Sequence, residues 1–247
     1  MTTQNRRRQS INGKMGRNWK TIAAAVVVAA TVFSLPAQAA RDGWPNRITV
    51  GGGPLEGTIQ FLSLGWSSLM NKKLELNASV ESTAGASVNA RLLSQGQQDF
   101  ATGILSGIAI HAHAGTGFAK GNKYLSLNLM FPLETLPAQF WTPKDSGIAK
   151  IEDIAGKRLN LSRPGSGVDL FGKAMLEATG LSPSQITNVG HGQANQMMQD
   201  GVLNVASTLG SPPHPAIAAQ TSKLDYLVFG MGHGDLAMKT IKVMPWF

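Results

Sequence analysis

The chain has 247 residues, 43% of them hydrophobic, which is enough apolar material for a packed core. It contains no cysteine, which excludes disulfides, thiolate metal sites and thiol nucleophiles. Its 22 Lys and Arg exceed its 14 Asp and Glu, but six of the basic residues and none of the acidic ones lie in the first 39 positions. The rest of the chain carries a net charge of only +2, so we expect no nucleic-acid partner.

Residues 1–39 have the pattern of a secretory signal peptide. A basic stretch that ends at Lys20 is followed by an apolar run over residues 23–35 and then by Ala37-Gln38-Ala39, a small-residue cleavage pattern. The apolar run is shorter than the roughly 20 residues that a helix needs to cross a bilayer. We therefore expect cleavage after Ala39 and export to the periplasm.

Beyond residue 39, runs rich in β-forming residues alternate with runs of helical periodicity. The first half predicts strands at 48–50, 75–81, 100–105 and 125–131, and helices at 58–71 and 86–94. The first helix is expected from the spacing of its apolar stripe, which consists of Ile59, Leu62, Trp66 and Leu69. The second half predicts strands at 138–142, 158–161, 186–189, 202–209 and 224–229, and helices at 193–200 and 234–242.

A further helix in the second half has clear boundaries. Ser166 is placed to cap its N-terminus, and Gly180 is placed to end it. The repeated β-α-β order predicts an α/β fold with mostly parallel sheets. Because the order occurs twice, we expect two lobes, residues 40–136 and residues 137–247.

Three loops rich in glycine and hydroxyl groups follow predicted strands, over residues 51–58, 82–89 and 163–167. In open α/β sheets, ligands bind beyond the carboxyl ends of strands and near helix N-termini. The loops offer backbone N–H groups and hydroxyls but almost no titratable groups, which suits holding a polar solute better than transforming one. Ordinary turns and helix caps are the alternative interpretation.

Motifs of nucleotide-binding proteins and hydrolases fit poorly. Residues 52–58 have the glycine spacing of a P-loop, but Thr58 stands where that motif needs lysine. A Ser-His-Asp triad could be assembled from Ser166, His191 and Asp169, yet Ser166 lacks the G-x-S-x-G context of a nucleophile elbow. We therefore expect no catalytic residues.

The histidines do not form a metal-binding pattern. His111 and His113 would share a face only on a strand, whereas their segment favours a helix. His191 follows a predicted strand, where a ligand contact is one interpretation and a surface-loop histidine is the one we favour. We expect neither a metal nor another cofactor.

Five motifs follow one another within residues 48–220. They are the strand and Gly-rich loop at 50–58, ESTAGASVNARLLSQG at 81–96, the stretch 145–159, Pro164-Gly165-Ser166-Gly167, and Gly210-x-Pro212-x-x-Pro215. In this order they resemble the motifs of the TAXI family, the extracytoplasmic receptors of tripartite ATP-independent periplasmic (TRAP) transporters.

The resemblance implies a type II periplasmic-binding-protein fold, in which two α/β lobes close on a small organic acid or amino acid. A membrane permease would receive the solute. The chain departs from the family at Ile59, where an aromatic residue is common, and at Ala86, where the family has serine, so the ligand's identity does not carry over. The family's return segment to the first lobe has no counterpart before Phe247, which we interpret as a C-terminal truncation.

The loop composition and the resemblance together predict a set of ligand-binding residues. They are Gly57, Thr58, Thr83, Ser87, Asn89, Ser106, Arg163, Gly165, Ser166 and Gly167. The helix N-terminus after Ser166 favours an anion, and Arg163 could add a two-pronged contact. We expect a monomer that binds a small carboxylate-bearing solute and delivers it to a TRAP-type permease. The alternatives are a receptor of an ATP-driven importer, an orphan periplasmic sensor and an exported hydrolase.

Overall fold

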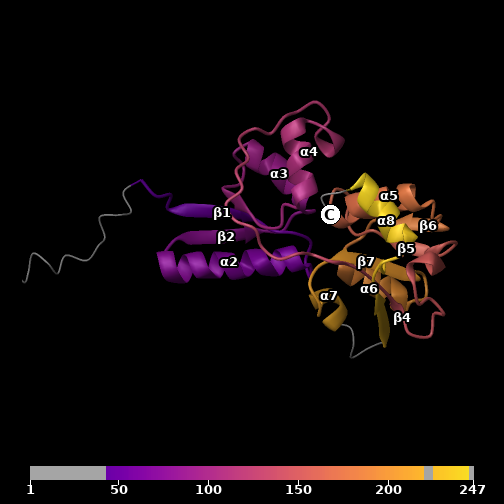
Figure 1. Ribbon diagram of the computed structural model, residues 1–247. Coiled ribbons are helices and arrows are strands. Elements are labelled where there is room, and N and C mark those ends of the chain that lie inside the picture. Colours follow the sequence, from indigo (N-terminus) through magenta and orange to yellow (C-terminus); the bar gives the residue numbers. More distant parts are fainter. Residues whose placement is uncertain (1–42, 220–224, 245–247) are drawn as a thin grey trace, which may run out of the picture. The chain divides into compact units, whose positions relative to one another are not determined.

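Eight strands form two sheets in the part of the chain that the computed structural model describes, residues 43–219 and 225–244 (Figure 1). The predicted signal peptide lies outside these residues. The first sheet has the order β2-β1-β3. Strand β1 (Arg47–Gly51) runs parallel both to β2 (Asn77–Glu81) and to the two-residue strand β3 (Phe100–Ala101).

The second sheet is mixed and has the order β6-β5-β7-β4-β8. Its members are β4 (Ala138–Pro143), β5 (Arg158–Asn160), β6 (Gln185–Thr187), β7 (Val205–Leu209) and β8 (Tyr226–Phe229). Strands β6, β5 and β7 are parallel, whereas β4 is antiparallel to both of its neighbours. The predicted α/β class is therefore confirmed, and most strand pairs are parallel as expected, with β4 as the exception.

Helices connect most of the strands. They are α2 (Thr58–Leu74), α3 (Ala86–Ser94), α4 (Ser106–Ala114), α5 (Gly167–Thr179), α6 (His191–Gln199), α7 (Pro215–Ala218) and α8 (Asp235–Val243). Short 3-10 helices cover Gly117–Ala119 and Ile151–Ile154. None of the helices in the described ranges is long and apolar enough to span a membrane.

The fully buried residues of helix α2 are mostly polar, whereas the apolar stripe that predicted the helix is half-buried or exposed. Ser63 Oγ donates to the carbonyl of Gly51 at 3.1 Å, and Ser67 Oγ donates to the carbonyl of Ala78 at 2.8 Å. Leu69, a member of the predicted stripe, is 51% exposed. Serine is small enough for the helix to approach the first sheet closely, and its hydroxyls reach the strand carbonyls. The position of the helix was predicted correctly, and the residues that predicted it, Ile59, Leu62 and Trp66 among them, are at most half-buried.

The strand expected at residues 125–131 does not form. This segment has no helix or strand, and Leu129 is 84% exposed. Phe131 instead makes an edge-on contact with Trp66 of α2, with ring centroids 5.2 Å apart. A run of apolar residues without a pairing partner cannot hold the extended ladder that strand propensity assumes.

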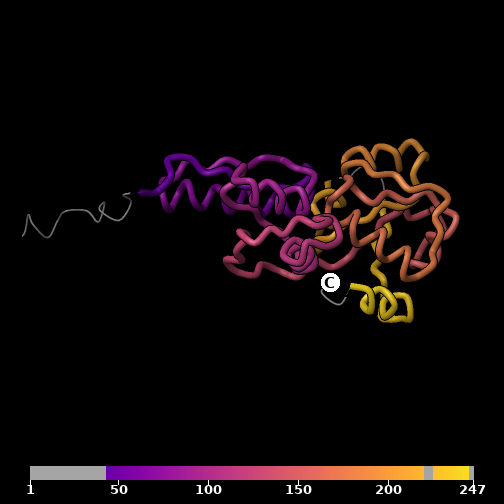
Figure 2. The backbone as a smooth tube through the Cα atoms, turned by 90° about the horizontal axis from the view of Figure 1, so that it is seen from above, coloured from indigo at the N-terminus to yellow at the C-terminus, as the bar shows by residue number. Residues whose placement is uncertain are grey.

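The second sheet has the larger hydrophobic core. The buried cluster on one side of it combines Phe140 of β4 with Leu159 of β5 and Met175 of α5. Met244 joins this cluster, and α8 lies beside α5 in Figure 1. In Figure 2 the segments of the first sheet, indigo to magenta, and those of the second, orange to yellow, form two groups. The lobe boundary at residue 137 stays a prediction.

Candidate functional site

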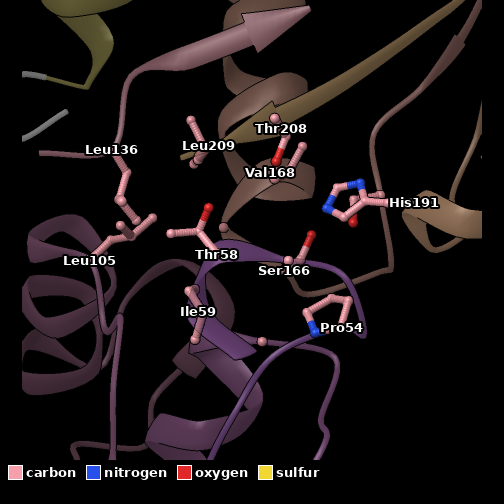
Figure 3. A pocket seen from close by; sticks show the side chains of 14 residues that line it. Pro54, Thr58, Ile59, Leu105, Leu136, Ser166, Val168, His191, Thr208 and Leu209 are labelled. Carbon is pink, nitrogen blue, oxygen red and sulfur yellow. The ribbon is translucent and has the colours of Figure 1, made fainter. Parts of the chain in front are cut away.

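A small cavity lies where loops from the first sheet meet loops from the second (Figure 3). Its volume is about 30 Å³, close to the share of one water molecule in the liquid. The lining residues are Pro54, Gly57, Thr58, Ile59, Gly85, Leu105, Leu136, Ser162, Ser166, Gly167, Val168, His191, Thr208 and Leu209. None of them is Asp, Glu, Lys or Arg, so any charged ligand must be held by neutral groups.

Three helices begin at this cavity. Thr58, Gly167 and His191 are the first residues of α2, α5 and α6, and all three line the cavity. The first N–H groups of a helix have no intrahelical acceptor, and the aligned peptide dipoles place partial positive charge there. Helices α2 and α6 have no acidic residue in their first turn to offset this charge. The convergence therefore favours an anion.

Several buried polar atoms of the lining have no hydrogen-bond partner among the described residues. They are Thr58 Oγ1, Ser162 Oγ and His191 Nδ1. Leaving such a group unpaired costs about 1–3 kcal/mol. Ser162 also has a φ of 60°, a left-handed conformation that costs a non-glycine residue about 1–2 kcal/mol. Unpaired groups and backbone strain at one place are typical of a binding site, because a ligand can supply the missing partners.

The cavity has one polar and one apolar side. Figure 3 shows the hydroxyls of Thr58, Ser166 and Thr208 and the ring of His191 turned toward one another. Leu105, Leu136 and Leu209 lie on the side opposite to His191 (Figure 3). This arrangement suits a ligand with an anionic head and a short apolar body.

His191 and His214 form a buried aromatic cluster with Trp141. The two imidazole centroids are 5.2 Å apart, and Trp141 lies 5.8 Å from His191 and 6.5 Å from His214. Burial, with smaller contributions from the neighbouring His214 and from the charge of Arg163, lowers the pKa of His191 to about 3. Burial lowers the pKa of His214 to about 4. Both rings are therefore neutral near pH 7, and the favoured expectation that His191 is a surface residue was wrong, since it is only 3% exposed.

Ser166 caps α5 as predicted, because its Oγ accepts the N–H of Asp169 at 3.1 Å. Its own hydroxyl proton remains available to the cavity. The carboxylate of Asp169 is engaged elsewhere, with Gly165 N–H, Lys173 Nζ and Asn188 Nδ2. Because His191 Nδ1 has no such partner among the described residues, the structure does not assemble the Ser-His-Asp triad.

The predicted ligand-binding residues divide into two groups. Four of them line the cavity: Gly57, Thr58, Ser166 and Gly167. The N–H of Gly165 is not turned to the cavity, since it donates to Asp169 Oδ2 at 3.0 Å. The N–H groups of Gly167 and Val168 have no acceptor in the described part of the chain and are the free donors of this helix N-terminus.

The predicted residues of the second loop support the first loop instead of lining the cavity. Asn89 Nδ2 donates to the carbonyl of Gly52 at 2.6 Å, and Thr83 Oγ1 lies 2.8 Å from Asn89 Oδ1. Ser87 Oγ donates to the carbonyl of Gly165, so it joins the second loop to the third. These contacts position the loops that surround the cavity.

Ser106 and Arg163 also lie outside the lining. Ser106 is exposed at the start of α4, and the preceding Leu105 lines the cavity in its place. Arg163 is exposed, and its guanidinium lies beside Gly190, the residue that caps α6. Its charge acts on His191 from there.

Ser162 and Thr208 also line the cavity, although they were not among the predicted residues. Both stand at the carboxyl ends of parallel strands, after β5 and in β7. The strand-end rule would have found Thr208, had it been applied to the predicted strand 202–209, and would have found Ser162, had the loop been taken from the end of the predicted strand at residue 161. Leu136 and Leu209 carry no comparable signal, because an apolar residue near a strand gives no indication of whether it faces a core or a ligand.

No group of three or more His, Cys, Asp or Glu in the described residues could hold a metal ion. His111 and His113 lie on helix α4, as expected.

The sequence model of the NMT1-like family matches residues 60–246. Among solved structures, an ancestral arginine-binding protein bound to arginine has a TM-score of 0.52 at 16% identity, covering 81% of this chain and 92% of that one. A substrate-binding protein of an ABC uptake transporter from Streptococcus pneumoniae, with bound histidine, also has a TM-score of 0.52 at 15% identity. That match covers 81% of this chain and 86% of the other. The alkanesulfonate-binding protein from Xanthomonas axonopodis pv. citri, bound to MOPS, has a TM-score of 0.51 at 15% identity. That match covers 77% of this chain and 62% of the other. The fold is that of periplasmic solute-binding proteins.

Proposed function

Because the chain belongs to the NMT1-like family and has the fold of periplasmic solute-binding proteins, we propose that it is an extracytoplasmic receptor for a small organic anion. One observation carries this proposal. Three helix N-termini and three unpaired buried polar atoms converge on a cavity whose lining has no charged side chain. Such a site stabilises negative charge through neutral donors.

The ligand that fits best is a small carboxylate, either an organic acid or an amino acid. The free N–H groups of Gly167 and Val168, with the hydroxyls of Thr58 and Ser166, can surround a carboxylate at the polar side. Arginine and histidine carry a carboxylate and MOPS a sulfonate, so the ligands of the similar structures share an anionic group. The leucines on the opposite side would contact the ligand's carbon atoms.

Ligand entry requires the loops around the cavity to separate. Pockets for small molecules usually measure about 300–1,000 Å³, whereas this cavity has about 30 Å³. The bond from Ser87 Oγ to the carbonyl of Gly165 joins the loops across the cavity's edge and would break on opening. The loops would then close over the bound solute.

Two kinds of transporter could receive the solute. The resemblance to the TAXI family favours a TRAP-type permease, whereas the similarity to a substrate-binding protein of an ABC uptake transporter favours an ATP-driven importer. We propose the TRAP-type partner. Uptake of labelled solute into vesicles that contain the receptor and its permease distinguishes them, because a TRAP transporter works on an ion gradient without ATP.

We also propose that the receptor works in the periplasm, on the strength of the signal-peptide pattern. N-terminal sequencing of exported protein is expected to begin at Ala40. An intact Met1 on protein recovered from the cytoplasm would contradict export.

The receptor function is tested by calorimetry against a panel of organic acids, amino acids and sulfonates. We expect at least one anion to bind, and Thr58→Val to weaken its binding roughly tenfold to a hundredfold, the effect of one hydrogen bond to a charged group. Thr142→Val is the matched control, since Thr142 is equally a buried threonine but donates to Asn204 and lies outside the lining. Equal affinities of the Thr58 and Thr142 variants for the same anion would refute this site.

A further inference from the structure

The hydrogen bonds of His214 fix where its ring proton lies. His214 Nδ1 accepts the backbone N–H of Ala216 at 3.2 Å. A backbone N–H is always a donor, so Nδ1 carries no proton. His214 is 1% exposed, and burial keeps the ring neutral, so its single proton is on Nε2.

This proton decides the direction of the next hydrogen bond. His214 Nε2 lies 2.8 Å from Thr208 Oγ1. Because Nε2 is the donor, Thr208 Oγ1 is the acceptor, and the hydroxyl proton of Thr208 must point elsewhere. Thr208 has no other side-chain hydrogen bond among the described residues, and it lines the cavity. Figure 3 shows its hydroxyl turned toward that of Thr58 and the cavity.

We propose that His214 makes Thr208 an obligatory hydrogen-bond donor, so that the site selects an ionised oxyanion over a neutral group of the same shape. The inference rests on the proposed function and deepens it. A carboxylate or sulfonate oxygen accepts the Thr208 proton at any orientation. If the NH₂ group of an amide occupies the same position, its protons face the hydroxyl proton of Thr208. Neither donor then has an acceptor. His214 does not touch the ligand and is a positioning residue.

The sequence around His214 offers a matched pair of variants. His214 is the N-cap of α7, and its Nδ1 serves as the capping acceptor. His214→Asn keeps a good capping acceptor but has no atom that reaches Thr208. His214→Gln weakens the cap, yet its longer amide can still donate to Thr208. A purely structural role of His214 predicts that the Gln variant is the worse of the two, and the proposed role predicts the opposite.

The probes are short carboxylates, each paired with its primary amide: acetate and acetamide, propionate and propionamide, isobutyrate and isobutyramide. Competition calorimetry gives the ratio of acid to amide affinity for each protein. We expect wild type and His214→Gln to share this ratio within about twofold, and His214→Asn and Thr208→Val to lower it roughly tenfold. The double variant His214→Asn/Thr208→Val should lower the acid-to-amide affinity ratio no further than Thr208→Val alone, because the two substitutions remove the same interaction.

The outcomes separate the two proposals. If wild type binds no anion of the calorimetry panel, these short acids included, the anion-receptor function fails, and this inference fails with it. If wild type binds panel anions but shows no preference for acids over amides, the receptor stands and the inference is refuted. If wild type prefers acids and His214→Asn keeps the full preference, the receptor stands and the role of His214 is refuted. A ligand-free readout is the ¹H–¹⁵N spectrum of the histidine rings, in which we expect an unprotonated Nδ1 and a protonated Nε2 for His214. The reverse tautomer would overturn the inference regardless of any ligand.

Discussion

The carboxylate of Asp169 holds together the loop that presents Ser166, and its replacement should be costly. The side chain is 2% exposed and accepts from Gly165 N–H at 3.0 Å, from Asn188 Nδ2 at 2.8 Å and from Lys173 Nζ at 3.0 Å. Asp169→Asn keeps the shape but removes the charge and turns an NH₂ group toward one of these donors. The amide cannot accept from all three.

The magnitude follows from the two part-buried hydrogen bonds that Gly165 and Asn188 donate to Asp169. A hydrogen bond to a charged group contributes about 1.5–3 kcal/mol, and a buried donor left unpaired costs about 1–3 kcal/mol. The Lys173 ion pair adds less than about 1 kcal/mol, because the Lys173 side chain is 57% exposed. We therefore expect Asp169→Asn to lower the free energy of unfolding by about 3 kcal/mol, or the melting temperature by about 6–12 °C for a domain of this size.

Urea unfolding followed by circular dichroism measures this loss. Lys173→Met is the matched control, since it removes the exposed ammonium and leaves the hydrogen bonds from Gly165 and Asn188 to Asp169 in place. We expect the control to lose less than about 1 kcal/mol. Equal losses of stability in the two variants, or an Asp169→Asn variant that unfolds at the same urea concentration as wild type, would contradict this role of Asp169.

Three further predictions concern the cavity and its support. Without ligand, Thr58→Val should raise the free energy of unfolding by about 1–2 kcal/mol in a urea titration, because it removes an unpaired buried hydroxyl. A loss of stability would contradict the assignment of that hydroxyl to the ligand. Asn89→Ala should lower stability by about 1–3 kcal/mol and change ligand affinity less than about threefold by calorimetry, since its amide bonds to Gly52 and not to the cavity. The free energy of unfolding should fall as the pH drops below 6.5, the ordinary pKa of histidine. In the folded state the pKa of His191 is about 3 and that of His214 about 4, so the unfolded chain takes up protons first. The slope approaches about 1.4 kcal/mol per pH unit for each histidine, and a denaturation series from pH 7.5 to 5 that stays flat would show that neither ring is buried and neutral.

Local signals in the sequence were sufficient for most elements and for the helix cap at the site. Helix α3 begins and ends at the predicted residues, and Ser166 and Gly180 delimit α5 as expected. Caps and C-terminal glycines act through neighbours within a few residues, so they are readable without the fold. The strand-end rule likewise selected Thr58 and Ser166, because it depends only on where a strand stops.

The same rule could not distinguish a residue that contacts the ligand from one that holds a neighbouring loop in place. Thr83 and Asn89 have the composition of ligand-binding residues, yet their hydrogen bonds go to Gly52, 31 and 37 positions earlier in the chain. A hydroxyl or an amide satisfies a backbone carbonyl as readily as a ligand. Which of the two it meets depends on the loop packed against it, and no local pattern specifies that loop.

By itself, the sequence determined the α/β class, the order of most elements and the loops that carry donors at strand ends. Only the tertiary structure decided which face of α2 is buried, because Ser63 and Ser67 find partners on strands of the first sheet. It also turned His191 from an expected surface residue into a buried neutral ring beside Trp141. The physical reason is common to both: burial depends on the surface that an element meets, and that surface comes from residues distant in the sequence.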